Sequence, residues 1–169
     1  EDNADVIIAA DAIIPDGYDA KVNNITIDGG SITIKDGGQL HSNVAVQATL
    51  EKKITGFTST NNHYYLIANP LNTEINPTAF GLTNGDYDLY RFDGTQFHEE
   101  WRNHKSTPFN MTAGIGYLYA NANDVTLQFT GTVRKQYSTL FYNGTALTYD
   151  TDNPFGTWNL VGNMFPYHG

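Results

Sequence analysis

The chain lacks cysteine altogether and is poor in basic residues. Among its 169 residues, nine are Lys or Arg and eighteen are Asp or Glu, which gives a formal net charge of -9 at pH 7. Without cysteine, disulfides, thiolate nucleophiles and zinc–thiolate sites are excluded. This charge, with no basic cluster to offset it, would repel nucleic acid and anionic membrane surfaces. We therefore expect no nucleic-acid partner.

Long apolar runs are also missing. No uninterrupted stretch approaches the ~18 apolar residues that a membrane-spanning helix requires, so we expect no insertion into a membrane. The first five residues, Glu1 to Asp5, carry neither the basic nor the apolar region of a signal peptide. These features predict a mature or trimmed segment of a longer protein.

The motifs of several enzyme classes are absent or incomplete. The sequence has no Gly-x-Ser-x-Gly elbow of a serine hydrolase. Gly114-Ile115-Gly116 lacks the third glycine of a dinucleotide-binding loop. No spacing marks the pair of carboxylates that a glycosidase needs. We therefore predict no catalytic residue, and we do not expect the chain to be an enzyme.

Short β-strand signals closed by glycine turns are the main positive feature. Residues 25–30 read Ile-Thr-Ile-Asp-Gly-Gly, and residues 32–38 read Ile-Thr-Ile-Lys-Asp-Gly-Gly. β-branched residues favour strands, and glycines after Asp favour tight turns. The seven-residue spacing from Ile25 to Ile32 predicts that the two segments stack and bury a shared isoleucine stripe.

Strand signals continue along the whole chain and become rich in aromatic residues beyond Gly56. Turn clusters of Gly, Asn and Asp separate them, at the spacing of a sandwich or barrel. The predicted fold is all-β: an antiparallel, jelly-roll-like β-sandwich preceded by a β-helix-like stack of short rungs. Near Asn43 we expect a boundary between the rungs (1–43) and the sandwich (44–169). The other predicted strands are 6–8, 12–14, 39–41, 44–50, 64–68, 87–92, 116–120, 125–129 and 158–162.

Taken together, five of these motifs resemble a β-rich module of large secreted or cell-surface, adhesin-like proteins of Bacteroidetes. They are IKDGGQL (34–40), YLIANP (65–70), YDLYRF (87–92), GYLYAN (116–121) and WNLVGN (158–163). The resemblance covers residues 25–166 and implies an exported bacterial protein with other domains in a longer chain. It implies no catalytic residue. Met164 stands where we would expect proline, and family members usually continue beyond the position of Gly169, so we expect the sandwich to be truncated.

The segment from His98 to His104 is the richest polar cluster. Its two histidines lie six residues apart, whereas a zincin helix places them four apart, so we predict no metal site. On a strand, Glu100 and Arg102 would share one face and Trp101 would occupy the other. The simplest interpretation is a buried Trp101 beneath an exposed face of mixed charge. A metal or catalytic role for the histidines is the alternative.

Aromatic side chains are the remaining candidates for a binding function. Exposed Trp or Tyr rings can serve as stacking platforms for sugars, with neighbouring polar groups for the hydroxyls. Trp101 with Glu100 and Arg102 fits this pattern, as does Tyr90 with Arg91. The alternative is that these rings fill the space between two sheets.

Residues 150–153 (DTDN) offer oxygen ligands for calcium but lack the glycine and glutamate of an EF-hand loop. A solvated turn is the simpler interpretation. A structural calcium site there stays open, and no cofactor is predicted.

These observations favour a non-catalytic, exported β module that acts as a structural or adhesive segment of a larger bacterial surface protein. The second hypothesis is a carbohydrate-binding module that accompanies a glycan-processing enzyme. The expected partner is a host or extracellular glycan or protein. Bare aromatic rings beside polar groups in a concave face would favour the second hypothesis.

Overall fold

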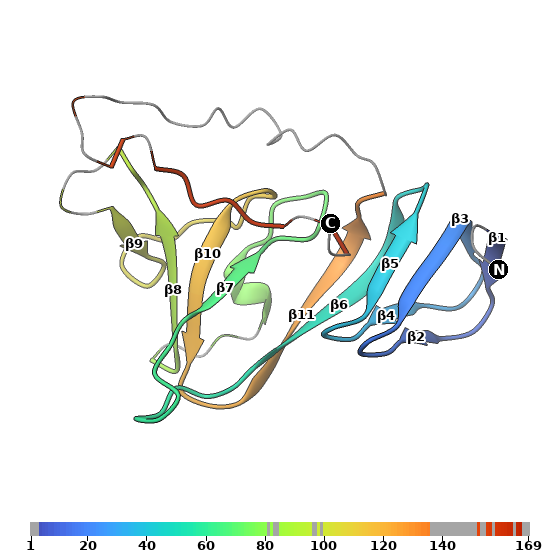
Figure 1. Cartoon of the computed structure of the whole chain (residues 1–169), viewed down its shortest axis with the longest axis horizontal. Coiled ribbons are helices and arrows are strands. Elements are labelled where there is room, and N and C mark those ends of the chain that lie inside the picture. Colours follow the sequence, from blue (N-terminus) through green and yellow to red (C-terminus); the bar gives the residue numbers. More distant parts are fainter. Residues whose placement is uncertain are drawn as a thin grey trace.

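The protein is all-β. The computed structural model describes residues 4–80, 82, 85–95, 98, 100–135, 152, 155–156, 158–163 and 165–166. The strands and the one 3-10 turn of this part of the chain are drawn in Figure 1. They are β1 (Ala4–Ile8), β2 (Ala12–Ile14), β3 (Asp19–Ile27), β4 (Ile32–Ile34), β5 (Gln39–Ser42), β6 (Val46–Ile54), β7 (Tyr65–Ala68), η1 (Pro77–Phe80), β8 (Tyr87–Phe92), β9 (Trp101–Asn103), β10 (Gly116–Asn121) and β11 (Val125–Val133). In these residues no helix has the length and apolar character needed to cross a lipid bilayer.

The first six strands alternate between two sheets. Strands β1, β3 and β5 pair in parallel in one sheet, and β2, β4 and β6 pair in parallel in another. Ala12 lies opposite Ile32 and Asp19 opposite Gln39, so partners in these pairs are twenty residues apart. Parallel neighbours need a connection of about a dozen residues or more, and this spacing provides it.

The two Ile-Thr-Ile segments do not stack on each other, so that prediction is wrong. Ile25–Ile27 ends β3, whereas Ile32–Ile34 is β4, and the two strands belong to different sheets. A seven-residue spacing is too short for a parallel crossover, so the intervening turn sends the chain into the other sheet. Their burial differs accordingly: Ile27 is 37% exposed, whereas Ile34 is 2% exposed.

Strand β6 connects the N-terminal parallel strands to the rest of the protein. On one side Leu50 of β6 lies opposite Ile34 of β4 in a parallel pair. On the other side β6 pairs with β11 in an antiparallel ladder along its whole length. The sheet β11-β6-β4-β2 is therefore mixed, and it runs across the boundary predicted near Asn43.

The third sheet, β7-β10-β8-β9, is entirely antiparallel. Alternation along its strands turns one face inward, where Tyr119 of β10 lies opposite Leu89 of β8 and both are buried. Leu127 and Phe129 of β11 belong to the same hydrophobic cluster. That cluster also contains residues of the parallel strands, among them Ile34, so one core extends through both parts of the described chain.

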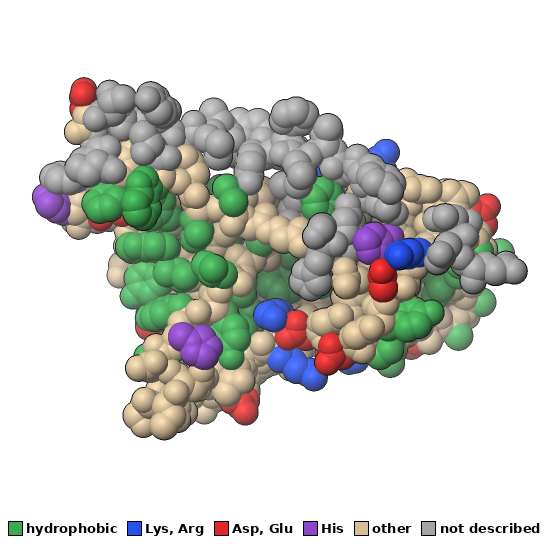
Figure 2. All heavy atoms as spheres, in the orientation of Figure 1, with side chains coloured by type: hydrophobic (Ala, Val, Ile, Leu, Met, Phe, Trp, Pro, Cys, Tyr) green, Lys and Arg blue, Asp and Glu red, His purple; other side chains and the backbone are tan. Residues whose placement is uncertain are grey.

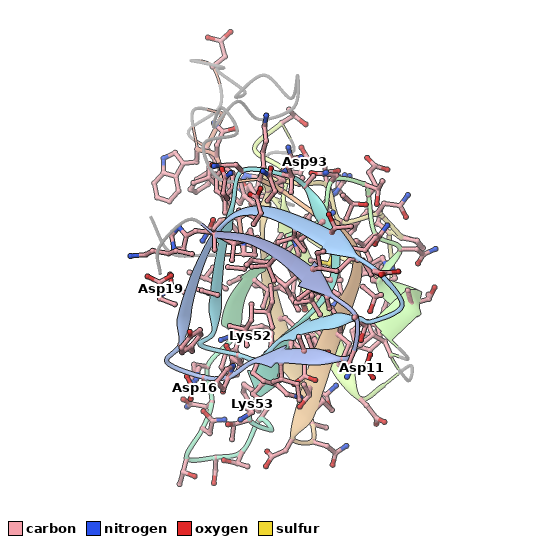
Figure 3. The ribbon with its side chains drawn as sticks, turned by 90° about the vertical axis from the view of Figure 1, so that its right-hand side faces the viewer. Asp11, Asp16, Asp19, Lys52, Lys53 and Asp93 are labelled. Atoms are coloured by element: carbon pink, nitrogen blue, oxygen red, sulfur yellow. The ribbon has the colours of Figure 1, made fainter. Side chains whose placement is uncertain are left out.

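The predicted strand 158–162 is not formed. Val161 makes an isolated bridge with Ile115, and the Gly116 amide donates a hydrogen bond to the Leu160 carbonyl (2.9 Å). In Figure 1 this red C-terminal segment passes in front of β10 and β7. At the opposite end of the molecule, Figure 3 shows Asp11, Asp16 and Asp19 around the outer strands β1 and β2.

Candidate functional site

The outer face of the antiparallel sheet carries apolar and aromatic side chains. Along β8, Tyr87 and Leu89 point into the core, so Tyr90 and Phe92 lie nearer the other face, where they are only partly buried. Trp101 lies opposite Phe92 in the β8–β9 ladder and therefore shares this face. Figure 2 shows hydrophobic side chains gathered over this part of the molecule.

Two tryptophans border a hollow at one end of this face. The hollow has a volume of about 260 Å³ and is lined by Phe92, Glu100, Trp101, Phe155, Trp158, Asn159 and Leu160. Trp101 is 44% exposed and Trp158 is 61% exposed. The Phe92 ring packs edge to face against Trp101, with 5.3 Å between the ring centroids. Phe155 packs in the same way against Trp158 at 5.6 Å.

The backbone of the C-terminal segment lies close to Gly94, which follows β8. A Cβ atom added at Gly94 would lie 2.6 Å from the Phe155 carbonyl oxygen and 3.3 Å from that of Trp158. The Trp158 amide donates to the Phe155 carbonyl (2.9 Å), which closes the turn that carries both rings. The hollow is therefore built from segments that are about sixty residues apart in the sequence.

Of the four predicted site residues, the structure brings three to this outer face. Trp101 and Glu100 line the hollow, and Tyr90 lies two residues from Phe92 on the same strand face. The Glu100 carboxylate accepts a hydrogen bond from the His98 amide (2.8 Å), and the Glu100 carbonyl accepts one from the Asp93 amide (2.6 Å). Arg102 lies opposite Arg91 in the ladder and so takes the other face of the sheet.

The interpretation of 98–104 as a strand with a buried Trp101 is wrong. Strand β9 covers Trp101–Asn103 alone, and His98 lies outside it with a φ of 67°. Trp101 is half-exposed, whereas His104 is 6% exposed and packs in the interior. The Tyr87 hydroxyl and His104 Nδ1 are 3.1 Å apart, within hydrogen-bond distance. The histidines therefore do not face each other across a shared site.

Aromatic rings continue from Tyr90 toward the other end of the sheet. The Tyr64 ring packs edge to face against Tyr90 at 5.9 Å and against Phe57 at 6.3 Å. A second hollow of about 270 Å³ lies at this end, lined by Phe57, Tyr64, Gly85, Asp86, Tyr87, Asp88, Ala120, Asn121 and Ala122.

Asp88 supplies a fixed negative charge in the lining of the second hollow. Burial acts to raise its pKa, but hydrogen bonds from Lys105 (2.8 Å) and from the Asn103 amide (3.0 Å) outweigh burial, so the pKa of Asp88 lies below its ordinary value. Burial, and then the charge of Asp88, raise the pKa of Tyr64. At neutral pH the pair is therefore an ionised carboxylate beside a protonated phenol.

Sequence reasoning missed the contributions of Phe57, Tyr64, Phe155 and Trp158 to this surface. Trp158 had a usable signal, because it is one of only two tryptophans and Asn159 follows it. Its proximity to Trp101 depends on the path of the C-terminal segment, which no local pattern encodes.

In the part of the chain that the structure describes, no group of three or more His, Asp or Glu side chains is placed to hold a metal ion. The calcium interpretation of 150–153 lies outside the described residues apart from Asp152.

Comparison of the chain with protein-family models, with curated proteins and with solved structures finds no match.

Proposed function

We propose that this chain is a non-catalytic β module of a larger exported bacterial surface protein, and that it binds carbohydrate in the hollow between Trp101 and Trp158. The observation that carries the proposal is the exposure of these two indole rings in one concave site. Buried rings would instead have favoured a purely structural segment.

The chemistry of the hollow suits a sugar. A pyranose ring has apolar C–H faces, which pack on flat aromatic rings, and hydroxyls around its edge, which need polar partners. Trp101 and Trp158 offer the rings, while Glu100 and Asn159 offer a carboxylate and an amide in the same lining. Ligand sites generally combine an aromatic lining with a few polar groups in this way.

The carboxylates near the hollow support binding without hydrolysis. A glycosidase needs an acid of raised pKa and a second carboxylate across the scissile bond. Glu100 is the one carboxylate among the described residues that line the hollow. The pKa of Asp88, farther along the same face, is lowered, and Lys105 already pairs with that carboxylate.

The parallel strands support a structural role beside the binding role. We propose that β1 to β6 form β-helix-like rungs and that the antiparallel sheet and β11-β6 form a jelly-roll-like sandwich. The twenty-residue offset in the β2–β4 and β3–β5 pairs supports the rungs. Side-chain bonds at the same offset, from Asn43 to Asn23 (2.8 Å) and from Ser31 to Asp11 (2.8 Å), support them too. Rungs of this kind would space the binding face away from neighbouring domains, which fits the motif resemblance to adhesin-like surface proteins.

Affinity electrophoresis tests the proposal. We expect the chain to be retarded in native gels that contain a soluble neutral polysaccharide, and we expect Trp101→Ala and Trp158→Ala to lose at least about tenfold in affinity, or about 1.4 kcal/mol. Tyr18→Ala is the matched control, because Tyr18 is an exposed aromatic residue of the N-terminal region, far from the hollow in the sequence. Equal retardation of all three variants and the wild type would contradict the proposal.

A further inference from the structure

Aromatic rings extend well beyond the Trp101–Trp158 hollow and reach the second hollow at the far end of the sheet. We infer that the ligand is an extended chain of a neutral polysaccharide, bound along an aromatic row that consists of Phe57, Tyr64, Tyr90, Phe92, Trp101 and Trp158. This inference rests on the proposed function and adds the class of ligand.

The row is continuous over the outer face. Phe57 contacts Tyr64, and Tyr64 contacts Tyr90. Tyr90 and Phe92 lie on one face of β8, about 7 Å apart along the strand. Phe92 then contacts Trp101, which shares the first hollow with Trp158. A single sugar would cover only one step of this row.

The two hollows have the size of subsites. Their volumes are about 260 and 270 Å³. Pockets that enclose a whole drug-sized ligand measure roughly 300–1,000 Å³, so each hollow is below that range. Two shallow hollows joined by aromatic rings fit successive units of one chain better than two separate small molecules.

Polar groups line the row at both ends. Glu100 and Asn159 lie at the Trp101 end, and Asp86, Asp88 and Asn121 at the Tyr64 end. Acceptor oxygens therefore stand beside the rings at each end, as the hydroxyls of a sugar chain require.

The charge along the row selects against acidic chains. Glu100, Asp86 and Asp88 are acidic, and Lys105 of this neighbourhood is already paired with Asp88. The whole chain carries a formal net charge of -9. A polyanion would be repelled from both ends of the row, so a neutral polysaccharide fits best.

The test varies the length of the ligand and the position of the substituted residue along the aromatic row. Native gels containing xyloglucan, mixed-linkage β-glucan, galactomannan or soluble starch would identify the polymer that binds, with polygalacturonate as the anionic control. Calorimetry with disaccharide to hexasaccharide fragments of that polymer would then follow. We expect affinity to rise at least tenfold from the shortest to the longest fragment. We also expect Tyr64→Ala to weaken binding of the hexasaccharide about fivefold or more, with Tyr64→Phe close to the wild type.

The outcomes separate this inference from the proposed function. If disaccharide and hexasaccharide bind equally, or if Tyr64→Ala binds the hexasaccharide like the wild type while Trp101→Ala does not, the extended row is wrong and the Trp101–Trp158 site stands. Tighter binding of polygalacturonate than of every neutral polymer would overturn the ligand class. The absence of binding to all of these polymers and fragments would overturn both proposals. Thermal unfolding of each variant shows whether a loss of binding comes from a loss of fold. If Tyr64→Ala unfolds, the dependence of wild-type affinity on fragment length still decides the test.

Discussion

Gly30 lies against the backbone of Ala10, twenty residues earlier in the chain. A Cβ atom added at Gly30 would overlap the Ala10 carbonyl oxygen and would lie 2.8 Å from the Ala10 amide nitrogen. The neighbouring Gly29 is required for a different reason: its φ is 85°, and an added Cβ there would have nothing within 4 Å. Gly29 therefore makes the turn, and Gly30 allows two backbone segments that are twenty residues apart to approach each other.

We predict that Gly30→Ala is more destabilising than Gly29→Ala. Gly29→Ala places an L-residue in the left-handed region, which costs roughly 1–2 kcal/mol. Overpacking costs roughly 1–3 kcal/mol, and we place Gly30→Ala at the upper end because the atoms in the way belong to the Ala10 backbone. Urea denaturation of the two variants measures both free energies of unfolding. Equal losses in the two variants would contradict the prediction, because separating the backbones at Ala10 and Gly30 would then cost no more than the left-handed strain at Gly29.

The same twenty-residue relationship explains which part of the N-terminal fold could be predicted. Local β propensity placed strands at 12–14 and 32–34, and the structure forms both. Their pairing depended on the longer period, which Asp16-Gly17 and Asp36-Gly37 carry in the sequence. Gly17 and Gly37 both have positive φ, at 74° and 89°. The seven-residue repeat is more conspicuous in the sequence than this twenty-residue period. Seven residues are too few for a parallel crossover, so the shorter repeat does not determine the pairing.

Asn69 organises the loop after β7 from a fully buried position. Its side-chain amide donates to the carbonyls of Thr73 (2.7 Å) and Met111 (2.8 Å), and its oxygen accepts from the Leu71 amide (2.8 Å). We predict that Asn69→Ala lowers the free energy of unfolding by about 3 kcal/mol, because it leaves buried backbone groups without partners. Urea denaturation checks this value.

Asn72→Ala is the control for Asn69→Ala. Asn72 is exposed, and its backbone amide bond to Thr132 does not involve the side chain. We expect a change of no more than about 0.5 kcal/mol. Similar losses in the two variants would mean that the buried bonds of Asn69 do not hold the loop.

The candidate site shows where local patterns stop being informative. Trp101, Glu100 and Tyr90 could be selected from the sequence because they occupy strand-like segments next to polar residues. The same polar cluster contains Arg102, yet strand alternation places Arg102 on the other face of the sheet. Trp158 joins the site only because the segment after Phe155 folds back over β8 and β10. That contact has a large sequence separation, and no periodicity within one segment encodes it.

Burial of His104 makes stability depend on pH. Burial lowers the pKa of His104 from its ordinary value of 6.5, since the interior disfavours the imidazolium. The ring packs against Phe109, with 5.1 Å between centroids, and Nδ1 lies 3.1 Å from the Tyr87 hydroxyl. Between pH 6.5 and the lowered pKa of the folded state, His104 therefore binds a proton in the unfolded chain but not in the folded chain.

The sign of the effect follows from proton binding. The unfolded state binds more protons than the folded state between the two pKa values, so stability falls as pH decreases from 6.5 toward the lowered folded pKa, with a slope of at most about 1.4 kcal/mol per pH unit. Above pH 6.5 this contribution is fully present. We predict that His104→Gln flattens the pH dependence of the unfolding free energy between pH 7.5 and 5, relative to the wild type. Parallel curves for the two proteins, or an NMR titration of the His104 ring with a midpoint at or above 6.5, would contradict the prediction.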